Sequence, residues 1–129
     1  MLIGKAKSKY IRISPYKLRP IVDVIRGKRV DEALAWLDTC SMKKIVPIKK
    51  TLISAYSNAK NLNPKTAEME RMFIKEIKID QGPVIKYFKP AAMGRAAIQR
   101  KRLSHLNVVV SAKEDKGVTS NKKIEVKNK

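Results

Sequence analysis

The chain has 129 residues, and its 30 Lys and Arg against 11 Asp and Glu give a formal net charge of +19 at pH 7. A surplus this large favours a polyanionic partner, either the phosphate backbone of a nucleic acid or an anionic membrane surface. No segment approaches the roughly 20 apolar residues that a spanning helix needs, so we expect no membrane partner.

The chain length and the cysteine content indicate the number of domains and the cellular compartment. A chain of this length usually forms one domain with a single core. Cys40 is the only cysteine, so no internal disulfide can form, which is typical of a reducing compartment. The N-terminal segment is basic but lacks the apolar run of a secretory signal. We therefore expect a cytoplasmic protein.

The first predicted elements are a short strand over residues 5–13 and the helix that follows it. Ser14 and Pro15 indicate a helix start, because serine caps the first free N–H groups and proline suits the first helical position. Gly27 is a typical helix end, whereas Pro20 removes one backbone hydrogen bond from the helix interior. The apolar residues of this helix recur at helical spacing: Leu18, Ile21, Val22 and Ile25.

Two further helices are predicted. Asp31 is expected to cap a short helix over residues 32–39 that carries Leu34 and Leu37 inward. Ser41 is expected to start the longest helix, roughly residues 42–61, with Pro47 near its first turns, where proline costs less. The core-facing stripe of this helix has spacings of three and four: Ile45, Ile48, Leu52, Ala55 and Ala59.

The second half of the chain changes to a period of two. Ile77 and Ile79 alternate with charged residues between Arg71 and Asp80, as in a half-buried strand. An alternating strand resumes with Leu106, Val108 and Val110, and we expect it to pair with the first. Residues 113–129 have few apolar residues and no periodicity, which predicts a disordered basic tail. Residues 1–112 are expected to form one domain.

Between these strands lies a basic segment, residues 82–106, with no acidic residue. A proline–glycine segment from Pro90 to Gly94 marks a turn in its middle, so the pattern predicts a long two-stranded hairpin. An isolated hairpin is marginal in water, because it has no second layer to bury against. A solvated surface hairpin is the simpler alternative, but such surfaces usually mix both signs of charge. We therefore expect nucleic acid to order this segment.

The predicted nucleic-acid-binding residues form two groups. The hairpin group consists of Lys86, Lys89, Arg95, Arg100, Lys101, Arg102 and His105. The N-terminal group consists of Lys5, Lys7, Lys9, Arg12, Lys17, Arg19, Arg26, Lys28 and Arg29. These side chains would neutralise phosphates and release counterions. The N-terminal residues could instead form an ordinary cationic strand edge that discourages aggregation.

Other chemistries find little support. Tyr87 and Phe88 could stack on unpaired bases, or could pack across the hairpin or onto the body. His105 has no acidic partner between Gly82 and Val110, so general acid–base catalysis is not predicted. Cys40 and His105 are too few ligands for a structural zinc site, and no phosphate-cradling loop precedes a helix. We predict no enzyme, metal, cofactor or small-molecule substrate.

Several motifs together resemble one known family. The first half contributes Ser14-Pro15, Lys17, Arg19, Asp23, Ile25-Arg26-Gly27-Lys28, Val30, Glu32-Ala33-Leu34, Lys49-Lys50, Leu52, Ser54-Ala55 and Asn58-Ala59. The second half contributes Gly82-Pro83, Pro90, Ala92, Gly94-Arg95-Ala96, Lys101-Arg102, Ser104-His105 and the run from Val108 to Ser111. Their order and spacing over roughly residues 6–111 resemble the bacterial type of the ribosomal protein L-twenty-two family.

The resemblance implies an α+β fold with three helices packed on a small antiparallel sheet and a long protruding β-hairpin. It implies a structural constituent of the large ribosomal subunit that binds 23S-type rRNA, contacts neighbouring ribosomal proteins and supports assembly. The hairpin, with about ten residues per strand, would reach roughly 30 Å. Its tip would line the nascent-peptide exit tunnel and contact the nascent peptide. The tip residues carried over in this way are Pro90, Ala91, Ala92, Met93 and Gly94.

The chain also departs from the family pattern. Basic residues are common in the family hairpin where Tyr87, Ala91, Met93 and Ile98 stand here. We therefore expect the tip to pack on bases or on neighbouring protein rather than to clamp phosphates. The alternative to the ribosomal interpretation is a free-standing architectural protein that binds DNA through a cationic hairpin.

Overall fold

The computed structural model describes residues 3–62, 64 and 68–112. The elements in chain order are β1 (Ile3–Ile11), α1 (Pro15–Ile25), α2 (Val30–Thr39), α3 (Ile45–Leu62), the short 3-10 helix η1 (Met69–Arg71), β2 (Met72–Pro90), a second 3-10 turn η2 (Ala92–Gly94) and β3 (Ala96–Ala112). Within these residues, three α-helices and one antiparallel sheet of three strands form the predicted α+β fold. The predicted tail, residues 113–129, lies outside the described residues.

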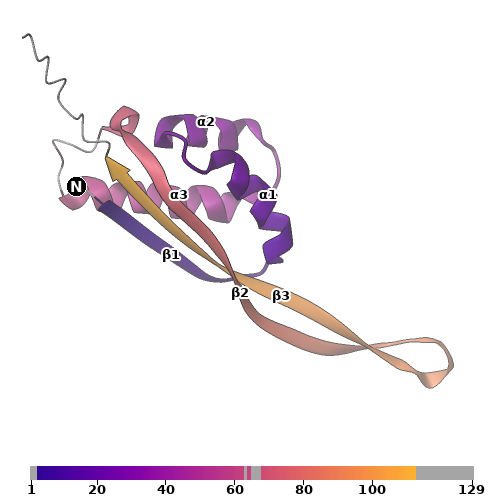
Figure 1. Cartoon of the computed structure of the whole chain (residues 1–129). Coiled ribbons are helices and arrows are strands. Elements are labelled where there is room, and N and C mark those ends of the chain that lie inside the picture. Colours follow the sequence, from indigo (N-terminus) through magenta and orange to yellow (C-terminus); the bar gives the residue numbers. More distant parts are fainter. Residues whose placement is uncertain (1–2, 63, 65–67, 113–129) are drawn as a thin grey trace, which may run out of the picture.

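The sheet has the order β1-β3-β2, with β3 antiparallel to both neighbours. The β1–β3 pairing runs from Ile3↔Ser111 to Ile11↔Ser104, whereas the β2–β3 pairing continues to Pro90↔Ala96. Figure 1 shows the helices over one face of the sheet and the β2–β3 hairpin projecting beyond it. We call residues 84–102 the arm and the other described residues the body.

The core of the body lies between the helices and this sheet face. The predicted inward residues of α1, α3 and β3 are all buried: Leu18, Ile21, Val22 and Ile25; Ile45, Ile48, Leu52, Ala55 and Ala59; Leu106, Val108 and Val110. In α2, Leu37 is buried and Leu34 is partly buried against the same cluster. Ile77 is buried and Ile79 packs at the edge of the core. The apolar periodicity of the sequence therefore identified the core correctly.

The helix α1 begins at Pro15 and ends at Ile25, as predicted. Ser14 occupies the N-cap position, but its hydroxyl makes no capping hydrogen bond, so the predicted capping role is wrong. The fixed φ of Pro15 at the first helical position accounts for the start instead. Gly27 follows the helix with a φ of +74°, which glycine adopts without the steric cost that a side chain would bring. Pro20 lies inside the helix on its exposed side.

Two predicted helix starts are wrong by a few residues. The helix α2 begins at Val30, so Asp31 lies in its first turn rather than at the cap. Val30 is fully buried, and its packing draws it into the helix ahead of the local capping signal. The helix α3 begins at Ile45 rather than at 42, because residues 41–44 are exposed and have no core contact to hold them helical. Pro47 is then the third helical residue, where no N–H bond is lost.

The helix α3 approaches β1 closely at Gly4. A Cβ atom on Gly4 would lie 2.3 Å from the backbone oxygen of Ala55 and 2.6 Å from the Cβ of Ala59. The Asn58 side chain donates a hydrogen bond to the Lys5 backbone oxygen at 2.8 Å. Small residues on both elements thus let the helix lie directly against the edge strand, which fixes the position of β1.

Candidate nucleic-acid interface

The arm begins where β2 bulges at Gly82 and Pro83. The β2–β3 register shifts between Gln81, which pairs with Ser104, and Val84, which pairs with Arg102. A Cβ atom on Gly82 would lie 3.0 Å from the Leu103 backbone, so the two strands approach closely here. Seven cross-strand pairs follow, from Val84↔Arg102 to Pro90↔Ala96. At roughly 3.3 Å per residue the arm reaches about 23 Å, less than predicted, because Gln81 and Ser104 still pair within the body.

The side chains of the arm have almost no burial. Every residue from Ile85 to Arg102 is exposed, including large apolar ones such as Phe88 at 72% and Ile98 at 56%. Phe88 and Ile98 lie directly opposite each other in the ladder, as do the like-charged Lys86 and Arg100. Like charges directly opposite each other destabilise a strand pair. The arm is therefore held mainly by its backbone hydrogen bonds.

The tip is a tight turn between Ala91 and Arg95. The Ala91 N–H donates to the Arg95 backbone oxygen at 2.7 Å, and Gly94 takes a φ of +68°. Met93 has a φ of +58° and its side chain is 95% exposed. Pro90 still belongs to the strand, where it pairs with Ala96. Four of the five predicted tip residues, Ala91 to Gly94, thus form the turn itself.

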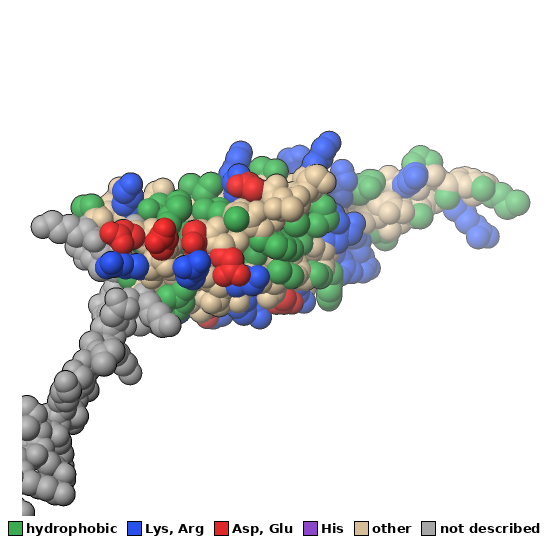
Figure 2. Space-filling view, turned by 90° about the horizontal axis from the view of Figure 1, so that it is seen from above, with side chains coloured by type: hydrophobic (Ala, Val, Ile, Leu, Met, Phe, Trp, Pro, Cys, Tyr) green, Lys and Arg blue, Asp and Glu red, His purple; other side chains and the backbone are tan. Residues whose placement is uncertain are grey.

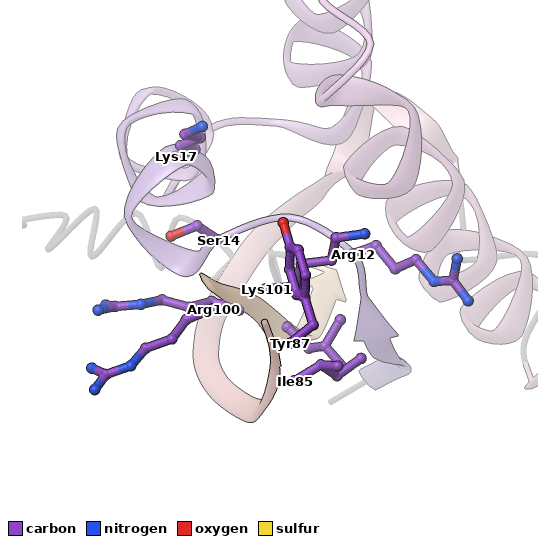
Figure 3. A pocket seen from close by; sticks show the side chains of 9 residues that line it. Arg12, Ser14, Lys17, Ile85, Tyr87, Arg100 and Lys101 are labelled. Atoms are coloured by element: carbon purple, nitrogen blue, oxygen red, sulfur yellow. The ribbon is translucent and has the colours of Figure 1, made fainter. Parts of the chain in front are cut away.

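A cleft of about 670 Å³ opens where the arm leaves the body (Figure 3). It is lined by Arg12, Ser14, Lys17, Ile85, Tyr87, Arg100, Lys101, Arg102 and Leu103. The lining includes five cations, and no carboxylate is among the described residues that form it. We call this the junction cleft. In the view of Figure 2, Lys and Arg side chains gather where the arm joins the body, whereas the acidic side chains lie on the body.

An irregular end of β1 directs Arg12 to the junction cleft. The β1–β3 register shifts between Ser8 and Ile11, and Tyr10 has a φ of +57°. His105 stabilises this bulge, since its Nδ1 accepts a hydrogen bond from the Tyr10 backbone N–H at 3.0 Å and its ring meets the Tyr10 ring edge to face at 4.9 Å. The buried Ser104 hydroxyl donates to the Ile13 backbone oxygen at 2.9 Å. These contacts fix the segment that carries Arg12.

Two tyrosines make cation–π contacts where the arm joins the body. The Lys101 ammonium lies 5.2 Å from the centre of the Tyr87 ring. The Tyr16 ring has the Arg19 guanidinium 5.2 Å away and that of Arg102 5.9 Å away. Contacts of this kind are favourable for Arg and Lys, so they hold Lys101 and Arg102 in place beside the cleft. Tyr16 was not predicted as a site residue, and no spacing in the sequence connects it with Arg102.

The predicted N-terminal group separates into three sets. Arg12 and Lys17 line the junction cleft, and Arg19 lies over the ring of Tyr16. The second set has acidic partners on the body: Arg26 with Asp23 at 3.2 Å, Lys28 with Glu32 at 3.4 Å and Arg29 with Asp31 at 3.3 Å. The third set, Lys5, Lys7 and Lys9, is exposed on β1.

The sheet face away from the helices carries both signs of charge. Glu76 and Lys78 form an ion pair on β2, and the Asn107 amide donates to Asp80 at 2.7 Å. The hydrogen bond from Lys78 and its charge lower the pKa of Glu76, and the same partner raises the pKa of Lys78. This face is therefore less cationic than the junction cleft. It also carries Lys5, which is in register with Glu76 because both residues pair with Val109 of β3.

The structure also bears on three other possibilities: a metal site, a reactive cysteine and a membrane-spanning helix. Within residues 3–62, 64 and 68–112, no group of three or more His, Cys, Asp or Glu side chains could hold a metal ion. Cys40 is a partly buried free thiol that packs against the core. The helices in the described part of the chain are all too short or too polar to cross a membrane.

Comparison with known proteins places this geometry in context. Residues 6–111 match the family described as ribosomal protein L22p/L17e. The large ribosomal subunit protein uL22 of Pelotomaculum thermopropionicum is 46% identical over 114 residues, which cover 87% of this chain and 97% of that protein. The proteins of the same name from Desulfitobacterium hafniense strain DCB-2 and Syntrophotalea carbinolica are 45% and 44% identical, over 87% and 85% of this chain and 96% and 98% of theirs.

Proposed function

Because this chain belongs to the ribosomal protein L22p/L17e family, we propose that it binds large-subunit rRNA through its arm and the junction cleft. The protein is a structural, non-enzymatic constituent of the large ribosomal subunit, located in the cytoplasmic ribosome. Its partners there are rRNA and other ribosomal proteins. Binding to 23S-type rRNA would help the subunit to assemble.

The observation that carries the proposal is a long arm that has no core of its own. Its residues from Ile85 to Arg102 are exposed, and two of its cations, Lys86 and Arg100, lie opposite each other. Phosphates between such cations would remove the repulsion and release counterions. Packed RNA would also supply the second layer that the hairpin lacks. An rRNA partner would thus neutralise the cations of the arm and also supply the packing surface that the arm lacks.

The proposed rRNA contacts come from both predicted groups. The arm residues Lys86, Lys89 and Arg95 would contact phosphates along its length. The junction residues Arg12, Lys17, Arg100, Lys101 and Arg102 would contact phosphates at its base. Lys5, Lys7 and Lys9 would add a peripheral contact, whereas the ion pairs of Arg26, Lys28 and Arg29 reduce their contribution. His105 would act by holding the bulge of β1 rather than by contacting phosphate.

The tip is proposed to line the nascent-peptide exit tunnel. Met93 is 95% exposed at the end of the arm, and the turn around it carries no charge from Pro90 to Gly94. An uncharged, apolar tip would let a passing peptide slide without being held by ion pairs. A photoreactive residue at position 93 should crosslink to nascent chains on translating ribosomes, whereas one at the exposed Tyr10 of the body should not.

Fractionation of cell lysates on sucrose gradients tests the rRNA proposal. The tagged protein should sediment with the large subunit in low salt and remain there through a high-salt wash. The triple variant R100Q/K101Q/R102Q should wash off at lower salt. The triple variant K43Q/K44Q/K50Q loses the same charge from exposed positions on the body and should behave as the wild type. Release of the wild type in high salt, or sedimentation with chromosomal DNA, would contradict the proposal.

A further inference from the structure

The junction cleft contains a concentration of charge that the protein does not neutralise. Its five cations come from three places in the chain: Arg12 after β1, Lys17 on α1, and Arg100 to Arg102 on β3. Basic residues elsewhere on the body have carboxylates within 3.2–3.4 Å, as with Arg26 and Asp23. No carboxylate is among the described residues of the cleft. Mutual repulsion of the five cations favours an anion at this place.

The cleft also has an apolar part. Ile85, Tyr87 and Leu103 lie among the cations, and Tyr87 is 43% exposed despite its contact with Lys101. In Figure 3 the Tyr87 ring stands between the side chains of Arg100 and Arg12, with Ser14 and Lys17 at the start of α1 nearby. The Lys101 ammonium lies 5.2 Å from the centre of this ring, so the cleft presents an apolar surface together with donors for phosphate.

These two features together select the class of ligand. A free phosphate ion would use the cations but would leave the apolar surface unused. A duplex keeps its bases stacked inside and presents chiefly its backbone. An unpaired nucleotide offers both a base face and flanking phosphates, and a volume of about 670 Å³ lies within the usual range for a bound small ligand.

We propose that the junction cleft binds an unpaired nucleotide of single-stranded RNA, with the base stacked on Tyr87 and the flanking phosphates on the surrounding Arg and Lys side chains. This inference rests on the proposed binding to rRNA and adds a specific site to it. Base stacking is tolerant of sequence, because every base has a π-face. The cleft would therefore recognise a bulged or looped-out nucleotide by its shape rather than by its identity.

Equilibrium binding of labelled RNA to the full-length protein tests the proposal. The probes are a short single-stranded oligoadenylate and a duplex with the same number of phosphates. The Y87A variant should bind the single strand about tenfold more weakly, whereas Y87F, which keeps the ring, should stay within about twofold of the wild type. The matched control is F88A, because Phe88 is the neighbouring aromatic residue, 72% exposed and not part of the cleft. F88A should also stay within about twofold, and none of the three should change duplex binding by more.

The following outcomes would overturn this site. The first is an equal loss of single-strand binding in Y87A and F88A, and the second is an equal loss of single-strand and duplex binding in Y87A. The third is displacement of the single strand by polyglutamate as effectively as by unlabelled oligoadenylate at equal charge concentration, which would show that charge alone, without base stacking, accounts for binding. If Y87A binds the single strand normally while the wild type still binds large-subunit rRNA, the nucleotide site fails and the proposed function stands. If the wild type does not bind large-subunit rRNA, both the nucleotide site and the proposed function are wrong.

Discussion

In the body, β2 and β3 bury one face against the helices, so that Ile74, Leu106 and Val110 are fully inaccessible. In the arm, the same two strands continue their backbone ladder, but every side chain from Ile85 to Arg102 is exposed. Burial of apolar surface contributes roughly 25 cal/mol per Å², and the arm gains almost none of it. One pair of strands is thus stabilised by the core at one end and lacks that stabilisation at the other, where we propose that rRNA supplies it.

Charge differs between the two regions in the same way. Several basic residues of the body, such as Lys28 and Arg29, have acidic partners. The sequence of the arm contains no acid, and Lys86 lies opposite Arg100. The body thus balances part of its charge internally, whereas the arm has no acidic residue of its own to do so. The following predictions test that difference.

The largest expected effect is on the stability of the body. Leu106 is fully buried on the central strand, so Leu106→Ala should lower the free energy of unfolding by about 2–5 kcal/mol. Ile98 is an apolar residue on the same strand, but its side chain is 56% exposed in the arm. Ile98→Ala should therefore change the free energy of unfolding by less than about 0.5 kcal/mol. Urea denaturation followed by circular dichroism measures both. Equal losses would show that the arm contributes to the core.

The next effect is on RNA binding. The triple variant R100Q/K101Q/R102Q should bind large-subunit rRNA more weakly, and the slope of log K against log salt should fall by about 2–3, since each phosphate contact contributes about 0.7–0.9. The stability of the body should not change, because these side chains are exposed. The control K43Q/K44Q/K50Q removes the same charge from the body. A control with the same loss of slope would mean that net charge, and not the arm, binds RNA.

A smaller effect separates the stability of the arm from its function. Lys86→Glu replaces a repulsive cross-strand pair with an attractive one opposite Arg100, which should stabilise the free arm by about 0.2–1 kcal/mol. The same change should weaken rRNA binding, because it places a negative charge at the interface. Amide hydrogen exchange of the arm measures the first effect and filter binding measures the second. If Lys86→Glu strengthened rRNA binding, the cations of the arm would not face phosphate.

The smallest effect concerns the sheet face of the body. The hydrogen bond from Lys78 lowers the pKa of Glu76, with Lys75 and Lys5 adding to the shift. A carboxylate whose pKa is lowered by folding stabilises the protein above its unfolded pKa and loses that contribution as the pH falls through the folded value. Glu76→Gln should therefore be slightly less stable than the wild type at pH near 7, and the difference should vanish in acid. A difference that does not depend on pH would contradict this origin.

The sequence predicted the body well where apolar periodicity was strong. The stripe of α3, from Ile45 to Ala59, is buried as expected, because helical spacing and burial report the same physical requirement. The starts of α2 and α3 were missed because local capping signals at Asp31 and Ser41 compete with packing. In α2, packing of the buried Val30 extends the helix ahead of Asp31. In α3, residues 41–44 make no packing contact that would hold them in the helix.

The hairpin and its tip were predicted from composition, but the junction cleft was not. Arg12 and Lys17 lie far along the chain from Arg102, and only the pairing of Ile11 with Ser104 brings the two segments together. Non-local register of this kind leaves no local pattern. Tyr16 and Ile85 were missed for the same reason, since their roles depend on neighbours from distant parts of the chain.

Amide hydrogen exchange across the whole chain, in the free protein and bound to large-subunit rRNA, tests the difference between body and arm most directly. Free protein should show slow exchange on β3 at Leu106 and Val108 and fast exchange from Val84 to Arg102. Binding should slow exchange throughout the arm and leave the core of the body unchanged. An arm that is already as protected as the body in the free protein, or that gains no protection on rRNA, would contradict the account.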